Sequence, residues 1–249
     1  MRPTKQIYNH YTEQDFLVWE TLFNRQMNIL EPIVSSEYLR ALKTVEFSSG
    51  KIPDFDEIAT CLKPLTGWSI YVVSNVSPKK QFFECLSQKK FTSTCWLRNI
   101  EQLDYLEEPD MFHDVFGHIP LLSNQEYARF LKGLSDIALK HFNNKKMIEL
   151  LGRIYWFTIE FGLLKEKDQL KIYGAGIISS AEETRHCLSV NAIHHPFDIG
   201  HIFGTDYRTD IVQEQYFLIE SFEQLYHSLP DIELLLQQYA AKKILHIQL

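Results

Sequence analysis

The sequence predicts one mostly α-helical domain with a few short strands. Apolar side chains recur every three or four residues over most of the 249-residue chain, which is the spacing of an amphipathic helix. Alternation of apolar and polar residues is confined to short segments, so a doubly wound parallel sheet is not expected. No segment rich in Pro, Gly or Ser divides the chain. Residues 1–249 are therefore expected to form a single domain with no separate regulatory domain.

Helix signals mark the N-terminal part of the chain. Thr12 is a candidate cap for a helix whose apolar positions run from Phe16 to Leu30, and Pro32 ends it. Residues 67–76 change to a period of two, which favours a strand. The other elements predicted in this part are short helices over residues 37–44, 54–62 and 78–86 and a strand over residues 91–97.

Beyond residue 100 almost every pattern is helical. Ser123 and Glu126 fit a capping box, in which two side chains satisfy backbone N–H groups at the start of a helix, and this helix is expected to reach about residue 142. The remaining predictions are helices over residues 145–165, 181–190, 209–228 and 231–246 and a strand pair at residues 170–173 and 174–178.

Charge and cysteine content exclude several classes of function. The chain has 25 Lys and Arg against 32 Asp and Glu, a net charge of −7, so neither nucleic acid nor a membrane is an expected partner. No segment approaches the roughly 18 apolar residues of a membrane-spanning helix. The four cysteines are scattered without a C-x-x-C pair, which is typical of reduced thiols in a reducing compartment. The expected location is the cytoplasm.

Two histidines five residues apart carry the first chemical signal. His113 and His118 lie in the segment EPDMFHDVFGHIP, and on an ideal α-helix they would point about 140° apart. Gly117 and Pro120 predict a break that leaves His113 in the last helical turn and His118 just past its end. The spacing is not H-E-x-x-H, which disfavours a zinc protease. On spacing alone, two unrelated histidines remain an alternative.

A single carboxylate in an apolar helix carries the second signal. Glu160 lies in RIYWFTIEFGLL, a segment that is apolar on almost every face and is therefore expected to be buried. A buried carboxylate needs a partner, which is either Arg153 or a metal bound together with His113 and His118. Two imidazoles and one carboxylate leave three positions of an octahedral ion open, as in non-heme Fe(II) oxygenases. No cysteine is nearby, which disfavours a structural zinc site.

Three segments, in order, carry a resemblance to a known family: EQLDYLEEPDMFHDVFGHIPLL, RIYWFTIEFGLL and IYGAGIISSAEE. They resemble the pterin-dependent aromatic amino acid hydroxylases, and most of all the bacterial single-domain phenylalanine 4-hydroxylases. IPDFDEI and LKPLTGW upstream are also similar, so the likeness covers residues 11–226. It implies one catalytic domain that hydroxylates an aromatic amino acid, L-phenylalanine to L-tyrosine, with Fe(II), O2 and tetrahydrobiopterin or a related tetrahydropterin. The longer animal enzymes carry tetramerisation segments that this chain lacks, so a monomer is expected.

The resemblance also implies roles for individual residues. His113, His118 and Glu160 would hold the iron. Arg98 would bind the substrate carboxylate and Asp110 would orient its guanidinium, because a planar fork matches a carboxylate in two parallel hydrogen bonds. The other implied positions are Trp156, Gly176 and Ser179 in the amino-acid pocket, Tyr155 and Asp114 around the iron ligands, and Phe82, Asn75 and Val76 at the pterin. From the residues alone, a surface ion pair for Arg98 and core packing for Trp156 and Phe82 are the alternatives.

The chain departs from the family pattern in residues 73–78, VSNVSP, where relatives place Gly-Leu against the pterin. Asn75 stands at the glycine position, and asparagine tolerates a positive φ angle. Either its side chain turns away and the pterin binds normally, or this wall is reshaped for a smaller or different reduced pterin. The accompanying differences at Ser74, Val76 and Ser77 favour the reshaped wall.

Other functions remain open on the sequence alone. Hydroxylation of tryptophan or tyrosine would need only one or two changed pocket residues. A zinc-dependent hydrolase with the same triad would need a general base, for which Asp114 is the candidate, and a non-catalytic binding protein could keep the fold. A second histidine cluster is expected to be solvated or capping, with its central run in a loop: His186, His194, His195 and His201.

Overall fold

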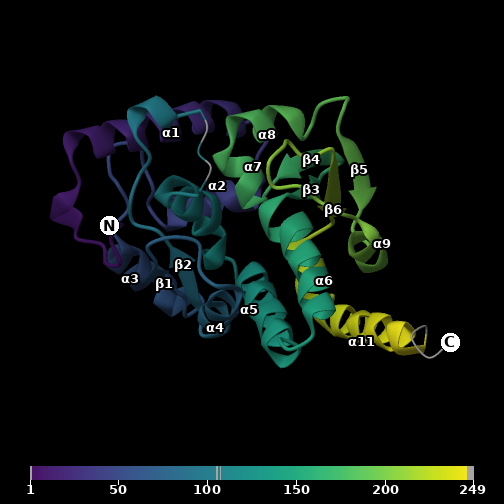
Figure 1. The fold of residues 1–249 in the computed structure, drawn as a ribbon. Coiled ribbons are helices and arrows are strands. Elements are labelled where there is room, and N and C mark those ends of the chain that lie inside the picture. The colour runs from purple at the N-terminus through teal and green to yellow at the C-terminus, as the bar shows by residue number, and fades with distance from the viewer. Residues whose placement is uncertain (1, 105, 107, 246–249) are drawn as a thin grey trace.

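The computed structural model describes residues 2–104, 106 and 108–245. An N-terminal and a C-terminal half lie beside each other, with helices α5 (Gln125–Lys140) and α6 (Lys145–Tyr155) between them (Figure 1). The N-terminal half holds α1 (Glu13–Leu30), α2 (Ser36–Thr44), α3 (Phe55–Leu65) and α4 (Lys79–Ser87). The C-terminal half holds α7 (Ala175–Ser179), α8 (Ala181–His186), α9 (Ile199–Gly204), α10 (Phe222–His227) and α11 (Leu229–Leu245). None of the described helices combines the length and apolarity that crossing a membrane requires.

Each half contains one small sheet. In the first, β1 (Ser69–Val72) pairs in parallel with β2 (Lys90–Ser93). The second has the strand order β4-β3-β6-β5, formed by β3 (Gly162–Glu166), β4 (Gln169–Ile172), β5 (Ile193–Pro196) and β6 (Gln215–Ile219). Strand β3 is antiparallel to β4 and parallel to β6, with Leu163 opposite both Ile172 and Leu218. The mostly α-helical class with few short strands is thus confirmed.

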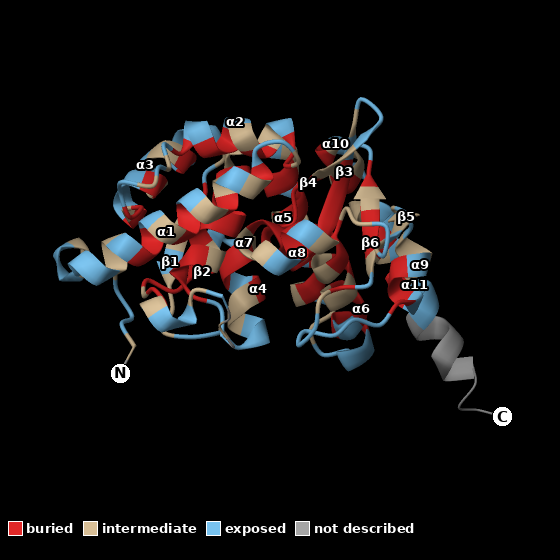
Figure 2. Cartoon of the chain, turned by 90° about the horizontal axis from the view of Figure 1, so that it is seen from above, coloured by how far each residue is buried: buried red, intermediate tan, exposed pale blue. Residues whose placement is uncertain are grey.

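One continuous apolar core joins the helices, and buried residues face inward along them (Figure 2). Trp19 of α1 packs edge-on against Phe112, with ring centroids 5.6 Å apart, and Phe23 packs against Phe116 at 5.3 Å. The hydroxyl of Tyr38 in α2 donates to the carbonyl of Phe116 at 2.6 Å. Helices α1 and α2 therefore fix the segment that carries His113 from behind.

The predicted cap of α1 is the observed one, whereas the predicted cap of α5 is wrong by one residue. Thr12 caps α1 and exchanges hydrogen bonds with Asp15 in a capping box. The cap of α5 is Asn124, whose side chain accepts from the backbone N–H of Tyr127, whereas Ser123 was the predicted capping residue. Ser123 instead ends a short 3-10 helix that begins at Pro120.

Four predicted elements are wrong in the C-terminal half. The helix predicted over residues 145–165 ends early, because the chain turns into a π-helix (Trp156–Glu160) and then into β3. Residues 174–178 form α7 rather than a strand, and 209–228 contain β6 before α10. The run His194-His195-Pro196 lies in β5, not in a loop. Strand pairing between distant segments, which local periodicity does not report, explains β3, β5 and β6.

Candidate metal centre

Three side chains converge at the centre of the molecule. The candidate ligand atoms of His113, His118 and Glu160 all lie within 4.8 Å of one another. His118 Nε2 is 3.3 Å from Glu160 Oε1, and His113 Nε2 is 3.8 Å from Glu160 Oε2. The two imidazole rings meet edge to face, with centroids 5.1 Å apart. The structure thus brings together the three residues that the sequence singled out.

The two histidines reach this geometry through a π-helix (Phe112–His118), not through a helix end. A π-helix bonds residue i to i+5, so residues five apart lie one turn above each other on the same face. The predicted break at Gly117 is therefore wrong. Gly117 has a different role: a Cβ there would lie 3.0 Å from the carbonyl oxygen of Ala175, so glycine allows α7 to approach this turn.

Glu160 is the last residue of the second π-helix, whose i+5 bond joins the Phe161 N–H to the Trp156 carbonyl at 2.8 Å. The prediction that Glu160 lies in the middle of a longer helix is therefore wrong. Arg153 is not its partner either, because the Arg153 guanidinium binds Glu149, Asp206 and the Phe203 carbonyl. Among the described residues, the groups facing the Glu160 carboxylate include the two imidazoles.

Hydrogen bonds and burial fix the protonation of this cluster. Ser179 Oγ donates to the Ala175 carbonyl at 2.9 Å, so its oxygen is free to accept from His113 Nδ1 at 2.8 Å. That contact assigns the proton to Nδ1 and leaves the Nε2 lone pair directed at Glu160. Burial lowers the pKa of His113 to about 4. Burial tends to raise the pKa of Glu160, but the neighbouring imidazoles hold it below its ordinary value.

This arrangement fits a divalent cation. At neutral pH a lone pair of His113 and an ionised Glu160 carboxylate face each other without a proton between them. Two acceptors this close repel each other unless a positive charge lies between them. Neutral imidazole and carboxylate are also the protonation states in which these groups bind metals.

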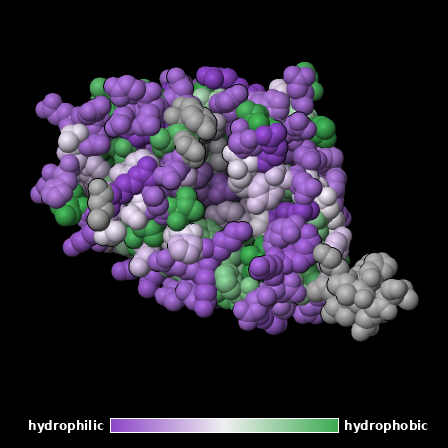
Figure 3. All heavy atoms as spheres, viewed as in Figure 1, coloured by the Kyte–Doolittle hydropathy of each residue, from purple (hydrophilic) through white to green (hydrophobic). Residues whose placement is uncertain are grey.

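A cavity of about 290 Å³ opens beside the triad. Figure 3 shows a hollow near the centre of the face drawn in Figure 1. The walls of the cavity include many of the predicted site residues: Asn75, Val76, Phe82, Asp114, Tyr155 and Trp156, together with the triad. Arg98, Asp110, Gly176 and Ser179 are not among the residues that line this cavity.

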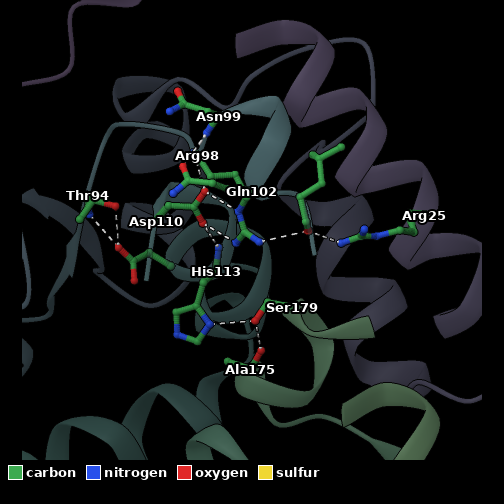
Figure 4. Close-up of polar contacts among 11 residues, drawn as sticks. Arg25, Thr94, Arg98, Asn99, Gln102, Asp110, His113, Ala175 and Ser179 are labelled. Carbon is green, nitrogen blue, oxygen red and sulfur yellow. Dashed lines mark hydrogen bonds and ion pairs between the residues drawn. The ribbon is translucent and has the colours of Figure 1, made fainter. Parts of the chain in front are cut away.

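Arg98 and Asp110 form a buried, doubly hydrogen-bonded pair (Figure 4). Arg98 Nε donates to Asp110 Oδ2 at 2.9 Å and Nη2 donates to Oδ1 at 2.8 Å. The backbone N–H groups of Arg98 and His113 donate to the same carboxylate. Asp110 is fully buried, so the surface ion pair that the residues alone suggested is wrong. The pair connects directly to the backbone of the first histidine.

Aromatic rings build one wall of the cavity around Trp156. Tyr207 stacks on the indole, with centroids 4.4 Å apart and planes 16° from parallel, and Phe161 contacts it at 4.6 Å. Phe161 in turn packs on Gly176, where a Cβ would lie 2.7 Å from its ring. Tyr207 was not among the predicted site residues; it lies between the predicted elements, just before residues 209–228. An isolated Tyr in the polar run DYRTD was the available signal.

A second part of the cavity lining contains an aromatic pair and a carboxylate held by hydrogen bonds. Phe82 of α4 packs edge-on against Tyr155, with centroids 5.5 Å apart. Asp114 Oδ2 accepts from the backbone N–H of Thr94 at 2.8 Å and from its hydroxyl at 3.0 Å. Burial raises the pKa of Asp114 to about 7.

The loop that carries Asn75 is tied to the N-terminal segment. Arg2 stacks on the Trp96 ring, 3.9 Å from its centroid, and hydrogen-bonds Asn75 Oδ1 and Glu108. Trp96 Nε1 donates to the Ser74 carbonyl at 3.2 Å. Asn75 does not adopt a positive φ angle, so the positive-φ turn considered for this position is wrong.

The second histidine cluster does not form a metal centre of three or more ligands within the described residues. His194 Nε2 contacts the Cys187 carbonyl at 2.7 Å, and His195 Nε2 contacts Gln215 Oε1 at 3.1 Å. His195 and His201 pack ring to ring, with centroids 4.4 Å apart. These histidines link β5, β6 and α9.

Comparison with known proteins adds three findings. The family model described as biopterin-dependent aromatic amino acid hydroxylase matches residues 3–242. Phenylalanine-4-hydroxylase of Ralstonia nicotianae is 40% identical over 223 residues, which cover 89% of this chain and 71% of that protein. The corresponding protein of Chromobacterium violaceum is 39% identical over 236 residues, with 93% and 78% covered.

Solved structures agree with this likeness. The structure of Chromobacterium violaceum phenylalanine hydroxylase with bound iron(III) and 7,8-dihydrobiopterin has a TM-score of 0.88 and 38% identity, and the match covers 95% of this chain and 86% of that one. The apo structure of the cold-active phenylalanine hydroxylase of Colwellia psychrerythraea has a TM-score of 0.89 and 35% identity, with 96% and 94% covered.

Proposed function

The chain belongs to the biopterin-dependent aromatic amino acid hydroxylases, and from that premise we propose that it converts L-phenylalanine to L-tyrosine at His113, His118 and Glu160. The observation that carries the proposal is the unprotonated His113 Nε2 facing the Glu160 carboxylate, which suits one divalent cation. Bound iron(II) would activate O2 with two electrons from a tetrahydropterin, so that one oxygen atom enters the ring and the other leaves with the pterin.

The chain's own residues position the reactants. His113, His118 and Glu160 would hold the ion from one side and would leave its other positions for O2 and water. Asp110 holds Arg98 through Nε and Nη2. Among the described residues, Nη1 makes one long contact, of 3.5 Å to the Leu103 carbonyl, so this nitrogen is left for the substrate carboxylate. Trp156 contacts the substrate ring, and Phe82 offers its ring to the pterin.

Aromatic packing builds one side of this site. Phe82 and Tyr155 pack together, and Tyr207 covers the indole of Trp156. A cavity with aromatic walls favours a ring substrate. Gly176 and Ser179 act on the site through other residues: Gly176 packs against Phe161, and Ser179 accepts from His113 Nδ1.

Product analysis with phenylalanine, tyrosine and tryptophan in parallel tests the proposal. Purified protein is supplied with Fe(II) and tetrahydrobiopterin, and oxygen uptake and products are measured. We expect pterin-dependent oxygen uptake with tyrosine formed from phenylalanine. Hydroxylation of tryptophan or tyrosine in preference would show a different member of the same family. Bound zinc without oxygen uptake would support the hydrolase alternative, with Asp114 as its base.

We further propose that the protein works as a monomer in the cytoplasm. All four cysteines are free thiols in the structure, and Cys85, Cys95 and Cys187 are buried. Light scattering coupled to size-exclusion chromatography measures the mass directly. A mass near 29.3 kDa supports the monomer, and twice that mass contradicts it.

Asn75→Gly tests the pterin wall. The Asn75 amide is bound by Arg2, which gives its side chain a partner outside the pterin and now favours normal cofactor binding over a reshaped wall. We expect the affinity for tetrahydrobiopterin, measured by calorimetric titration, to change by less than about threefold, the scale of one exposed hydrogen bond. A markedly tighter complex in the glycine variant would instead show that the Asn75 side chain crowds the cofactor.

A further inference from the structure

We infer that Gln213 is the positioning residue that fixes the indole of Trp156, and through it the aromatic wall of the cavity. Trp156 Nε1 donates to Gln213 Oε1 at 3.0 Å. Gln213 does not line the cavity beside the triad, so it acts only through its neighbours. The inference rests on the proposed function in one respect, namely that Trp156 contacts the substrate ring.

The orientation of the Gln213 amide is determined by its other contacts. Nε2 donates to the Arg208 carbonyl at 2.7 Å and to the Ile211 carbonyl at 2.9 Å. Both amide hydrogens are therefore used, and a flipped amide would point its oxygen at two carbonyl oxygens. Oε1 must face the indole N–H. Because Gln213 is only 5% exposed, water does not replace these bonds readily.

The backbone of Gln213 is held as firmly as its side chain. Its N–H donates to Glu183 Oε1 at 2.8 Å, and the Tyr216 hydroxyl donates to Glu183 Oε2 at 2.7 Å. Glu183 lies on α8 and Tyr216 on β6, so two elements of the C-terminal half fix the position of the amide. The chain of contacts runs from this buried carboxylate to the cavity wall.

Gln213 also shapes the loop that covers the indole. Its two carbonyl acceptors lie in residues 205–214, the segment that carries Tyr207, and Tyr207 stacks on Trp156. One amide therefore sets the rotation of the indole in its plane and supports the ring stacked on its face. Trp156 begins the π-helix that ends at Glu160, so a displaced indole would disturb the wall next to a proposed iron ligand.

A double-mutant cycle separates positioning from general stability. The variants are Gln213→Leu, Trp156→Phe and the pair, because phenylalanine keeps a ring but has no N–H. Gln215→Leu is the matched control, since Gln215 contacts His195 and does not line the cavity. We expect Gln213→Leu in the iron-loaded enzyme to raise the KM for phenylalanine roughly five- to tenfold, the effect of one buried hydrogen bond. The KM for tetrahydrobiopterin should stay within about twofold, and less tyrosine should form per pterin oxidised.

In the Trp156→Phe background, Gln213→Leu should add less than about twofold to the phenylalanine KM, because the bond it removes is already absent. Multiplicative effects in the two backgrounds would overturn the inference, as would an unchanged KM in a folded Gln213→Leu variant. A loss of activity in Gln215→Leu equal to that in Gln213→Leu would also overturn it.

A second readout does not depend on the reaction. The indole N–H resonance of Trp156, identified by its absence from Trp156→Phe, is recorded in protein loaded with diamagnetic Zn²⁺. We expect this resonance to move in Gln213→Leu and to stay in place in Gln215→Leu. If the wild-type protein failed to hydroxylate phenylalanine, the proposed function would fail while the resonance still decided the role of Gln213. A resonance unmoved by Gln213→Leu would contradict the hydrogen bond itself.

Discussion

Glu160→Ala is expected to lose iron and to abolish hydroxylation while the protein still folds. Two imidazoles alone hold a labile divalent ion poorly, and the third ligand also balances the charge of the ion. In the metal-free protein the substitution removes a buried carboxylate, so the melting temperature of the apo form should not fall. Iron content by elemental analysis, oxygen uptake and thermal unfolding of the same preparation measure the three effects.

The control for this variant is Glu20→Ala, an exposed glutamate on α1. It should keep its iron and its activity. Full activity in a folded, iron-containing Glu160→Ala variant would contradict the assignment of Glu160 as a ligand. Loss of iron with unchanged hydroxylation would contradict the role of the metal.

Arg98→Lys is expected to raise the KM for phenylalanine roughly ten- to a hundredfold, which corresponds to the ~1.5–3 kcal/mol of a charge-assisted, partly desolvated contact. Lysine has no planar fork, so it cannot bind Asp110 through two nitrogens and present a third to the substrate. Oxidation of the tetrahydropterin should persist in part, because the substitution leaves the triad in place. Steady-state kinetics with phenylalanine and pterin varied in turn separate the two effects.

Arg40→Lys is a suitable control, since Arg40 forms an exposed ion pair with Glu37 on α2. Its kinetic constants should match those of the wild type. An unchanged phenylalanine KM in Arg98→Lys would mean that the buried Arg98–Asp110 pair only supports the fold around His113. In that case Asp110→Asn would lower the melting temperature without changing the KM.

The identity of the triad could be predicted from sequence, but its geometry could not. A carboxylate in an apolar segment and a close histidine pair are local facts of composition. The π-helical turns that align them depend on i to i+5 bonding, which apolar periodicity does not report. The predicted break at Gly117 was a reasonable way to bring His113 and His118 together on an α-helix, and the wider turn made it unnecessary.

Residues whose roles depend on distant partners were the hardest to predict. Arg98 acquired its role only by resemblance, because nothing near it in sequence shows that Asp110 will lie opposite. Strand β6 reads as part of a helix until β3 and β5 are seen on either side of it. Gln213 lies just before this strand, inside the helix predicted over residues 209–228, and was missed for the same reason.

The two π-helical turns make the length of these segments as important as their composition. Each residue of an α-helix turns the chain by about 100°, so one further residue between His113 and His118 would carry one imidazole away from the other. One residue fewer would return the turn to an ordinary helix with the histidines four apart, still on one face. A further residue between Trp156 and Glu160 would carry the carboxylate away from the cavity wall in the same way. Over generations such segments can exchange side chains but cannot gain a residue. Insertions among active members of this family should therefore be absent from both turns and collect in the surface loops.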